Sequence, residues 1–103
     1  MKNMNQMMKQ AKKLQEDMIK AQESLADMTV TGSAGGDAVQ VDMNGHRRAV
    51  GVRIKPDAVN PEDVEMLEDL ILTALQDADK KVDALAEEQL GKYTKGLNIP
   101  GLF

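Results

Sequence analysis

The feature that most constrains this chain is an unbroken apolar repeat near its beginning. Between Met4 and Met28, apolar or small residues recur at alternating spacings of three and four. They are Met4, Met7, Ala11, Leu14, Met18, Ala21, Leu25 and Met28. This spacing aligns them along one face of an α-helix, and no proline or glycine interrupts the stretch. The pattern predicts a long first helix whose apolar seam packs in a core or against a second helix.

After Met28 the periodicity changes from helical to alternating. Residues 29–31 and 38–43 alternate apolar and polar side chains, as half-buried strands do, and the glycine-rich segment 32–36 between them predicts a turn. That segment is not a phosphate-binding loop, because no lysine follows it and it leads into a strand rather than a helix.

A second hairpin is predicted at Asn44-Gly45, the pair that best suits a two-residue type I′ turn. A third strand should then cover residues 46–54. A two-residue turn sets Val39 opposite Val50 and Asp42 opposite Arg47, so that one register gives an apolar pair and a pair of opposite charge.

A second long helix should begin at Asn60 and Pro61, with asparagine as the cap and proline at the first helical position. Apolar residues continue at helical spacing from Val64 until Gly91, which predicts the helix end. The expected architecture is α+β, in the order α-β-β-β-α, with a three-stranded antiparallel sheet and two long helices. Residues 1–91 form a single domain, and residues 92–103 form an irregular tail.

The lengths of these elements predict a dimer. The helices should be roughly 37 Å and 45 Å long, whereas strands of about seven residues span only some 23 Å. The helices therefore extend past the sheet with their apolar stripes uncovered, and a second copy of the chain would cover them. Connectivity leaves residues 1–15 and 80–95 as the free helix ends.

These free ends carry a concentration of positive charge, which we call the basic pole. Eight lysines and three acidic residues give the two stretches a net charge of +5, although the whole chain of 103 residues has a net charge of −4. The lysines are Lys2, Lys9, Lys12, Lys13, Lys80, Lys81, Lys92 and Lys95. Lysine clusters are often only solvated helix faces, but two clusters at the same free ends suit contacts with DNA phosphates.

A second basic patch lies on the predicted hairpin. Its members are Arg47, Arg48, Arg53 and Lys55. It is either an additional DNA contact or a charged strand edge that discourages aggregation, and the sequence leaves both interpretations open.

Composition narrows the possible functions. Only Tyr93 and Phe103 are aromatic, which disfavours proteins that stack unpaired bases and leaves double-stranded DNA as the nucleic-acid partner. The chain contains no cysteine and no long apolar run, so we expect a cytoplasmic protein that neither spans a membrane nor enters a secretory route.

No motif indicates an enzyme, a cofactor or a small-molecule substrate. His46 is the only histidine and lacks partners for a transition-metal site. The carboxylates Glu62, Glu65, Glu68 and Asp69 lack the Glu-x-x-His spacing of a dimetal site and are better explained as a solvated face.

The whole chain resembles the YbaB/EbfC family of bacterial nucleoid-associated DNA-binding proteins. The resemblance rests on the order of several segments: the opening Met-Lys-Asn-Met, the turn at 32–36, Asn44-Gly45, residues 61–71 and the terminal Pro-Gly-Leu-Phe. It implies a tweezer-like homodimer whose long helices hold DNA, with a role in organising the nucleoid or influencing transcription. The lysines Lys9, Lys12, Lys13, Lys80 and Lys81 occupy the matching arm positions, while Lys92 and Lys95 follow the predicted helix end.

The leading hypothesis is therefore a homodimer that binds duplex DNA through lysine-bearing helical arms without a chemical step. The alternative is a non-catalytic adaptor whose methionine-rich seam binds a protein partner, its charges serving only solubility.

Overall fold

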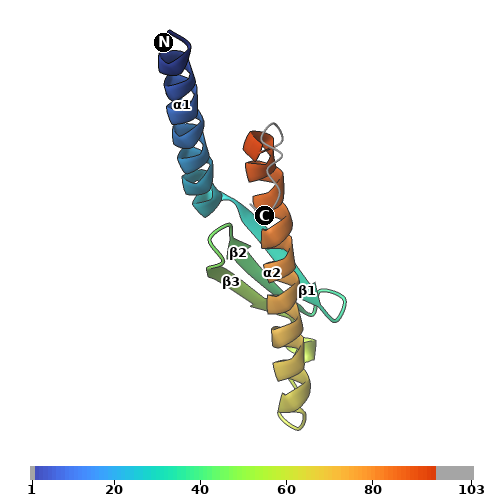
Figure 1. The fold of residues 1–103 in the computed structure, drawn as a ribbon. Helices are drawn as coiled ribbons and strands as arrows, with labels where there is room; N and C mark the ends of the chain where they lie inside the picture. Colours follow the sequence, from blue (N-terminus) through green and yellow to red (C-terminus); the bar gives the residue numbers. More distant parts are fainter. Residues whose placement is uncertain (1, 95–103) are drawn as a thin grey trace.

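The computed structural model describes residues 2–94 and contains two long helices and one sheet (Figure 1). Helix α1 (Lys2–Ser24) leads through a single 3₁₀ turn, Leu25–Asp27, into three strands. These are β1 (Thr29–Ala34), β2 (Val39–Asn44) and β3 (Ala49–Ile54). A second 3₁₀ turn, Pro56–Ala58, precedes helix α2 (Val64–Thr94). The predicted α-β-β-β-α order is confirmed.

The sheet is antiparallel throughout, in the order β1-β2-β3, and α2 crosses one of its faces over β1 and β2. Alternate residues of β2 face the helix, and Val39 and Val41 are fully buried. Small residues on α2 let the two layers approach closely: at Gly32 of β1, an added Cβ would lie only 2.7 Å from the Ala78 Cβ. The core is therefore a thin layer between one helix and two strands.

The seam of α1 is covered by the chain only at its C-terminal end. Leu25 is 4% exposed, whereas Met4 and Met7 near the helix start are each 67% exposed. An apolar helical stripe is stable in water only when it packs against something, and the described residues leave the free half of α1, residues 4–13, exposed.

The glycine-rich turn is shorter than predicted. Strand β1 continues through Gly32 to Ala34, and the turn begins only at Gly35. Gly35, Gly36 and Asp37 all have positive φ values, a conformation that glycine adopts readily and aspartate tolerates. The turn therefore lies where consecutive residues can take the left-handed conformation.

The predicted register of the second hairpin is wrong. Val39 pairs with Ile54 and Asp42 with Gly51, and a β-bulge lies between Asp42 and Met43. The loop has three residues instead of two, because the amide of Asn44 donates to the Arg48 carbonyl at 2.9 Å and closes the pairing there. Arg47 has a φ of 64°, as expected when a type I turn is followed by one left-handed residue.

Helix α2 starts later than predicted. Asn60 and Pro61 belong to a preceding turn, in which the Asp63 amide donates to the Asn60 carbonyl at 2.9 Å. The cap is Asp63, whose Oδ1 accepts a hydrogen bond from the Met66 amide at 3.2 Å.

The predicted helix end at Gly91 is also wrong, since α2 continues to Thr94. Residues 92–94 of the predicted tail are thus helical, and the remainder, 95–103, lies outside the described residues.

The molecule is long and narrow, with extents of 74 × 26 × 16 Å. Helix α1 and the C-terminal end of α2 extend from the same end of the sheet, and the N-terminal end of α2 extends past the opposite end (Figure 1). Neither helix, over residues 2–94, is both long and apolar enough to cross a membrane.

Candidate nucleic-acid interface

The free half of α1 carries three exposed lysines, Lys9, Lys12 and Lys13. The first acidic residue in the chain is Glu16, and the first turn of α1 contains no acid. None of the three lysines has an ion-pair partner among residues 2–94. The N-terminal end of a helix also carries the positive end of the helix dipole. This segment therefore projects with positive charges that no acidic side chain among the described residues neutralises.

The predicted lysines of α2 differ in their surroundings. Lys80 is exposed beside the sheet, whereas Lys81 bonds to the body of the protein. Its Nζ donates to the Thr31 carbonyl of β1 at 2.8 Å and lies 3.1 Å from the Asp77 carboxylate. Lys81 thus belongs to the contact between α2 and β1, a role that its sequence position did not reveal.

Three members of the basic pole are less fully described. Lys2 and Lys92 lie within α1 and α2, but their side chains are not described. Lys95 lies outside the described residues.

Asp77 fixes α2 over β1 together with Lys81. The backbone amide of Ser33 donates to Asp77 Oδ2 at 2.9 Å. This hydrogen bond, followed by the one from Lys81, holds the pKa of the Asp77 carboxyl below its ordinary value. The carboxylate is therefore the form that the fold stabilises.

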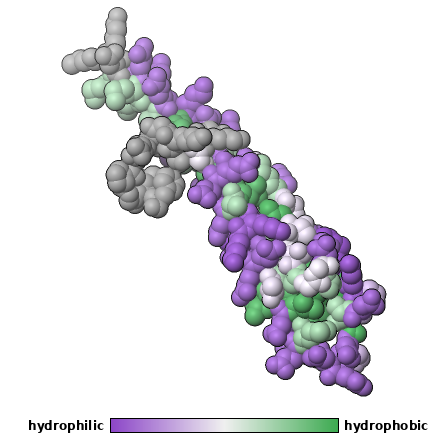
Figure 2. Space-filling model, turned by 90° about the vertical axis from the view of Figure 1, so that its right-hand side faces the viewer, coloured by the Kyte–Doolittle hydropathy of each residue, from purple (hydrophilic) through white to green (hydrophobic). Residues whose placement is uncertain are grey.

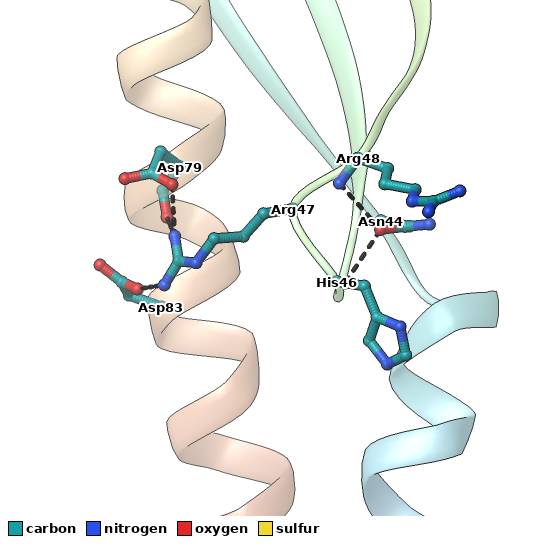
Figure 3. A network of polar contacts seen from close by, with 6 residues as sticks. All are labelled: Asn44, His46, Arg47, Arg48, Asp79 and Asp83. Atoms are coloured by element: carbon teal, nitrogen blue, oxygen red, sulfur yellow. Dashed lines mark hydrogen bonds and ion pairs between the residues drawn. The ribbon is translucent and has the colours of Figure 1, made fainter.

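Two residues of the predicted hairpin patch are engaged within the fold. Arg47 forms ion pairs with both Asp79 and Asp83 of α2 (Figure 3). Arg53 pairs with Asp42 on the neighbouring strand at 2.5 Å. Because the two charges cancel, this pair adds no net positive charge to the patch. The remaining two, Arg48 and Lys55, are exposed and without an ion pair in the described part of the chain.

The pair on the strands also shifts its own protonation equilibria. Hydrogen bonds from Arg53, and then from the Thr31 hydroxyl at 2.8 Å, lower the pKa of Asp42. The pKa of Arg53 is raised in turn, chiefly by its hydrogen bond to Asp42. Both groups therefore stay charged and paired at neutral pH.

Acidic side chains gather at the other end of the molecule. Glu62, Asp63, Glu65, Glu68 and Asp69 lie at the start of α2, the end that points away from α1 (Figure 1). The −4 net charge is thus an average over two poles of opposite sign.

An apolar surface remains uncovered between α2 and β3. Leu72 of α2 is 54% exposed, and Val52 of β3 is 56% exposed, although Val52 lies directly opposite the buried Val41. A hollow of about 450 Å³ between α2 and the end of β2 is lined by Met43, Leu75, Gln76, Asp79 and Lys80. On the side of the molecule that lies to the right in Figure 1, hydrophobic residues also gather on the half away from α1, with hydrophilic residues around them (Figure 2). Helix α2 is therefore too narrow to cover the sheet by itself.

The described residues contain no cluster of three or more histidine, cysteine, aspartate or glutamate side chains arranged to hold a metal ion. A second hollow of about 360 Å³ lies on the acidic end of α2, lined by Asp63, Glu65, Met66, Asp69, Leu70 and Thr73.

The chain is thus a small α+β protein in which a lysine-bearing helix projects from an incompletely covered sheet, with basic and acidic side chains at opposite ends. The chain belongs to the YbaB/EbfC DNA-binding family, whose sequence model matches residues 1–97. The resemblance inferred from the sequence is confirmed.

Curated relatives match over almost their whole length. A nucleoid-associated protein of Exiguobacterium sibiricum is 55% identical over 103 residues, which cover 100% of this chain and 97% of the relative. A nucleoid-associated protein of Pelotomaculum thermopropionicum is 50% identical, covering 98% of this chain and 96% of the relative. One from Bacillus thuringiensis is 54% identical, covering 98% and 93%.

The fold is also found in a solved structure. The crystal structure of the uncharacterized protein HP0035 from Helicobacter pylori superimposes with a TM-score of 0.70. It is 23% identical and covers 85% of this chain and 92% of its own. This likeness supports the arrangement of two long helices on a small sheet.

Proposed function

We propose that this protein binds double-stranded DNA of the nucleoid as a homodimer, through lysines on its projecting helices. The carrying observation is the run of exposed lysines on α1, Lys9, Lys12 and Lys13, which have no ion-pair partner among the residues that the structure describes, in a family described as DNA-binding. Ammonium groups on a projecting helix suit phosphate contacts, which dominate affinity and carry no base sequence. Binding then has weak sequence preference, and effects on transcription follow from DNA organisation.

The second copy is supported by the uncovered apolar surface. Val52 and Leu72 are more than half exposed, and Met4 and Met7 leave the α1 seam open. Burying such surfaces is favourable at roughly 25 cal/mol per Å² of apolar area. Pairing two chains would cover them and double the number of lysine arms.

Within this proposal the lysines contribute unequally. Lys9, Lys12 and Lys13 form the main contact, with Lys2 at the helix start beside them. Lys80 contributes from the side of α2, and Lys92 and Lys95 are included as further contacts from their positions in the sequence alone. Lys81 contributes least, because its ammonium group already bonds to Thr31 and Asp77.

Salt titration of duplex binding tests the proposal. The variant Lys9→Gln, Lys12→Gln, Lys13→Gln should bind more weakly and flatten the plot of log affinity against log salt by about 0.9 for each lost phosphate contact. The matched control Lys20→Gln, Arg48→Gln, Lys55→Gln removes equal charge from other exposed positions.

The control should keep a slope close to that of the native protein. Equal losses in both variants would reduce the effect to net charge, and an unchanged slope in the first variant would overturn the arm assignment.

The rival adaptor function is favoured by one observation, the exposure of Met4, Met7 and Met8 at 67–68%. Methionine-rich surfaces adapt to varied partners. If the seam binds another protein, Met4→Gln, Met7→Gln, Met8→Gln should abolish a nuclease-resistant complex while leaving duplex affinity and the homodimer intact.

A further inference from the structure

The tip of the β2–β3 hairpin, residues 44–48, lies between the two long helices and bonds to both. Figure 3 shows Arg47 reaching toward α2 while His46 lies on the side of α1. Within this tip, Arg47 contacts α2 and His46 contacts α1.

On the α2 side, one guanidinium contacts two carboxylates that lie on successive turns of the helix. Arg47 Nη1 contacts the Asp79 carboxylate and donates to the Asp79 carbonyl at 3.2 Å, while Nη2 contacts the Asp83 carboxylate. Asp79 and Asp83 are one helical turn apart and therefore share a face. The rigid, planar guanidinium offers a donor to each carboxylate from a fixed direction, which a flexible ammonium group does not.

On the α1 side, the contacts are made by the chain just before Arg47. The Gly45 amide donates to the Leu25 carbonyl at 2.9 Å and to the Met28 carbonyl at 3.0 Å. His46 Nε2 lies 2.7 Å from the Gln22 carbonyl in the last turn of α1. A Cβ added at Gly45 would lie 2.6 Å from the Leu25 Cβ, so the hairpin tip and the end of α1 are in close contact.

The conformation of the tip directs its side chains. Asn44 Oδ1 accepts hydrogen bonds from the His46 amide at 2.9 Å and the Arg48 amide at 3.1 Å. With the loop fixed in this way, the left-handed backbone at Arg47 turns its side chain away from that of His46 (Figure 3).

From this arrangement we infer that the hairpin tip is a brace that sets the separation and angle of α1 and α2, and that Arg47 and His46 are positioning residues for DNA binding. The inference rests on the proposed function, because the helices it positions are the proposed DNA-binding arms. Arg47 is 47% exposed and its partners are 55% and 61% exposed. Ion pairs this exposed add little free energy, so the brace acts through the combined contacts of residues 45–47 with α2 and with the chain at the end of α1.

The spacing between the helices can be measured directly, because the chain has no cysteine. Spin labels at Gln10→Cys on α1 and Glu88→Cys on α2, both exposed positions, report an intrachain distance by double electron–electron resonance. Dilution with excess unlabelled protein keeps one labelled chain in each assembly. Arg47→Ala should broaden the distance distribution, while the adjacent control Arg48→Ala should leave it unchanged.

Arg47→Lys separates charge from bracing. It keeps the net charge but cannot engage both carboxylates in the same way, so the distribution should broaden here too. A native-like distribution in both Arg47 variants, with unchanged circular dichroism, would overturn the brace.

Duplex affinity gives a second test, because electrostatics alone and the brace predict changes in affinity of opposite sign. Asp79→Asn, Asp83→Asn removes two negative charges, so electrostatics alone makes DNA binding tighter. The brace instead makes it several-fold weaker, because the arms lose their common orientation; tighter binding would contradict it. If the native protein fails to bind duplex, the proposed function falls, while the spin-label distances still decide whether the brace exists.

Discussion

Asp77 joins the two layers of the fold through one carboxylate. It accepts a hydrogen bond from the Ser33 amide and pairs with Lys81, which in turn donates to Thr31. Helix α2 is thereby held in register along β1, just where Ala74 and Ala78 pack closely on Gly32. The charge of one carboxylate therefore helps to hold α2 in the position that the close packing on Gly32 requires.

This arrangement gives stability a defined pH dependence. The folded pKa of Asp77 is lowered, so its contribution is fully present above the unfolded carboxyl value of about 3.9 and is lost as pH falls through the lower folded value. Asp77→Asn should therefore be less stable than the native protein at pH 7, with the difference shrinking below about pH 4. Urea unfolding across this range measures it; a difference independent of pH would exclude the carboxylate as its source.

The sequence could not predict which basic side chains of the candidate site form ion pairs within the fold. The lysines of the basic pole were found because charge can be counted along the chain. The sequence left open whether Arg47 and Arg53 contact DNA or only form a charged strand edge, because their carboxylate partners lie on other elements, 36 residues away for Asp83 and 11 for Asp42. Nothing in the local sequence distinguishes these arginines from Arg48, which remains unpaired in the described structure.

At the scale of elements, strong periodicity predicted type and order correctly, while short local signals placed the boundaries wrongly. The seam of α1 and the stripe of α2 span many turns, so their sum outweighs individual residues. The Asn44-Gly45 pair is compatible with more than one loop. The choice was made by tertiary contacts, in particular the hydrogen bonds of the Gly45 amide to Leu25 and Met28.

The start of α2 illustrates the same limit. Asn60 and Asp63 are both good capping residues, and proline after Asn60 favoured the earlier start. Asn60 instead accepts from the Glu62 amide within the turn, at 3.0 Å. The cap therefore falls to Asp63, whose carboxylate also lies favourably at the helix N-terminus.

This cap gives a prediction for the stability of α2. Asp63→Ala should lower the free energy of unfolding by about 1 kcal/mol, because the Met66 amide loses its acceptor. Glu65→Ala serves as the control, since it removes a neighbouring acidic charge without removing the cap. Thermal unfolding measures both. Equal losses would assign the effect to charge at the helix start instead of the cap.

For the whole molecule, shape and charge are arranged along the same axis. The basic half of α1 and the acidic start of α2 lie at opposite ends of a body 74 Å long (Figure 1). The sequence predicted the positive charge on the free end of α1. The prediction that connectivity fixes the free ends as residues 1–15 and 80–95 was wrong, because the start of α2 also extends past the sheet (Figure 1) and Val82 is buried in the core. The sequence also did not predict that α2 would leave β3 uncovered, which depends on where the helix crosses the sheet.

That uncovered surface leads to a prediction about assembly. Val52→Glu, Leu72→Glu should shift the solution mass from two chains to one of 11.3 kDa, since charges there would have to be buried in the interface. Lys55→Glu, an exposed substitution beyond the end of β3, should leave the mass unchanged. Sedimentation at several concentrations decides; a native protein that stays monomeric throughout would refute the homodimer.

The most direct test of the central claim is to map the DNA contact on the protein. Titrating a short duplex into isotopically labelled protein and following its amide resonances by nuclear magnetic resonance assigns the contact residue by residue. We expect the largest shifts at Lys9, Lys12 and Lys13, and little change at residues 62–69. Shifts concentrated at the acidic start of α2, with residues 9–13 unaffected, would contradict the account.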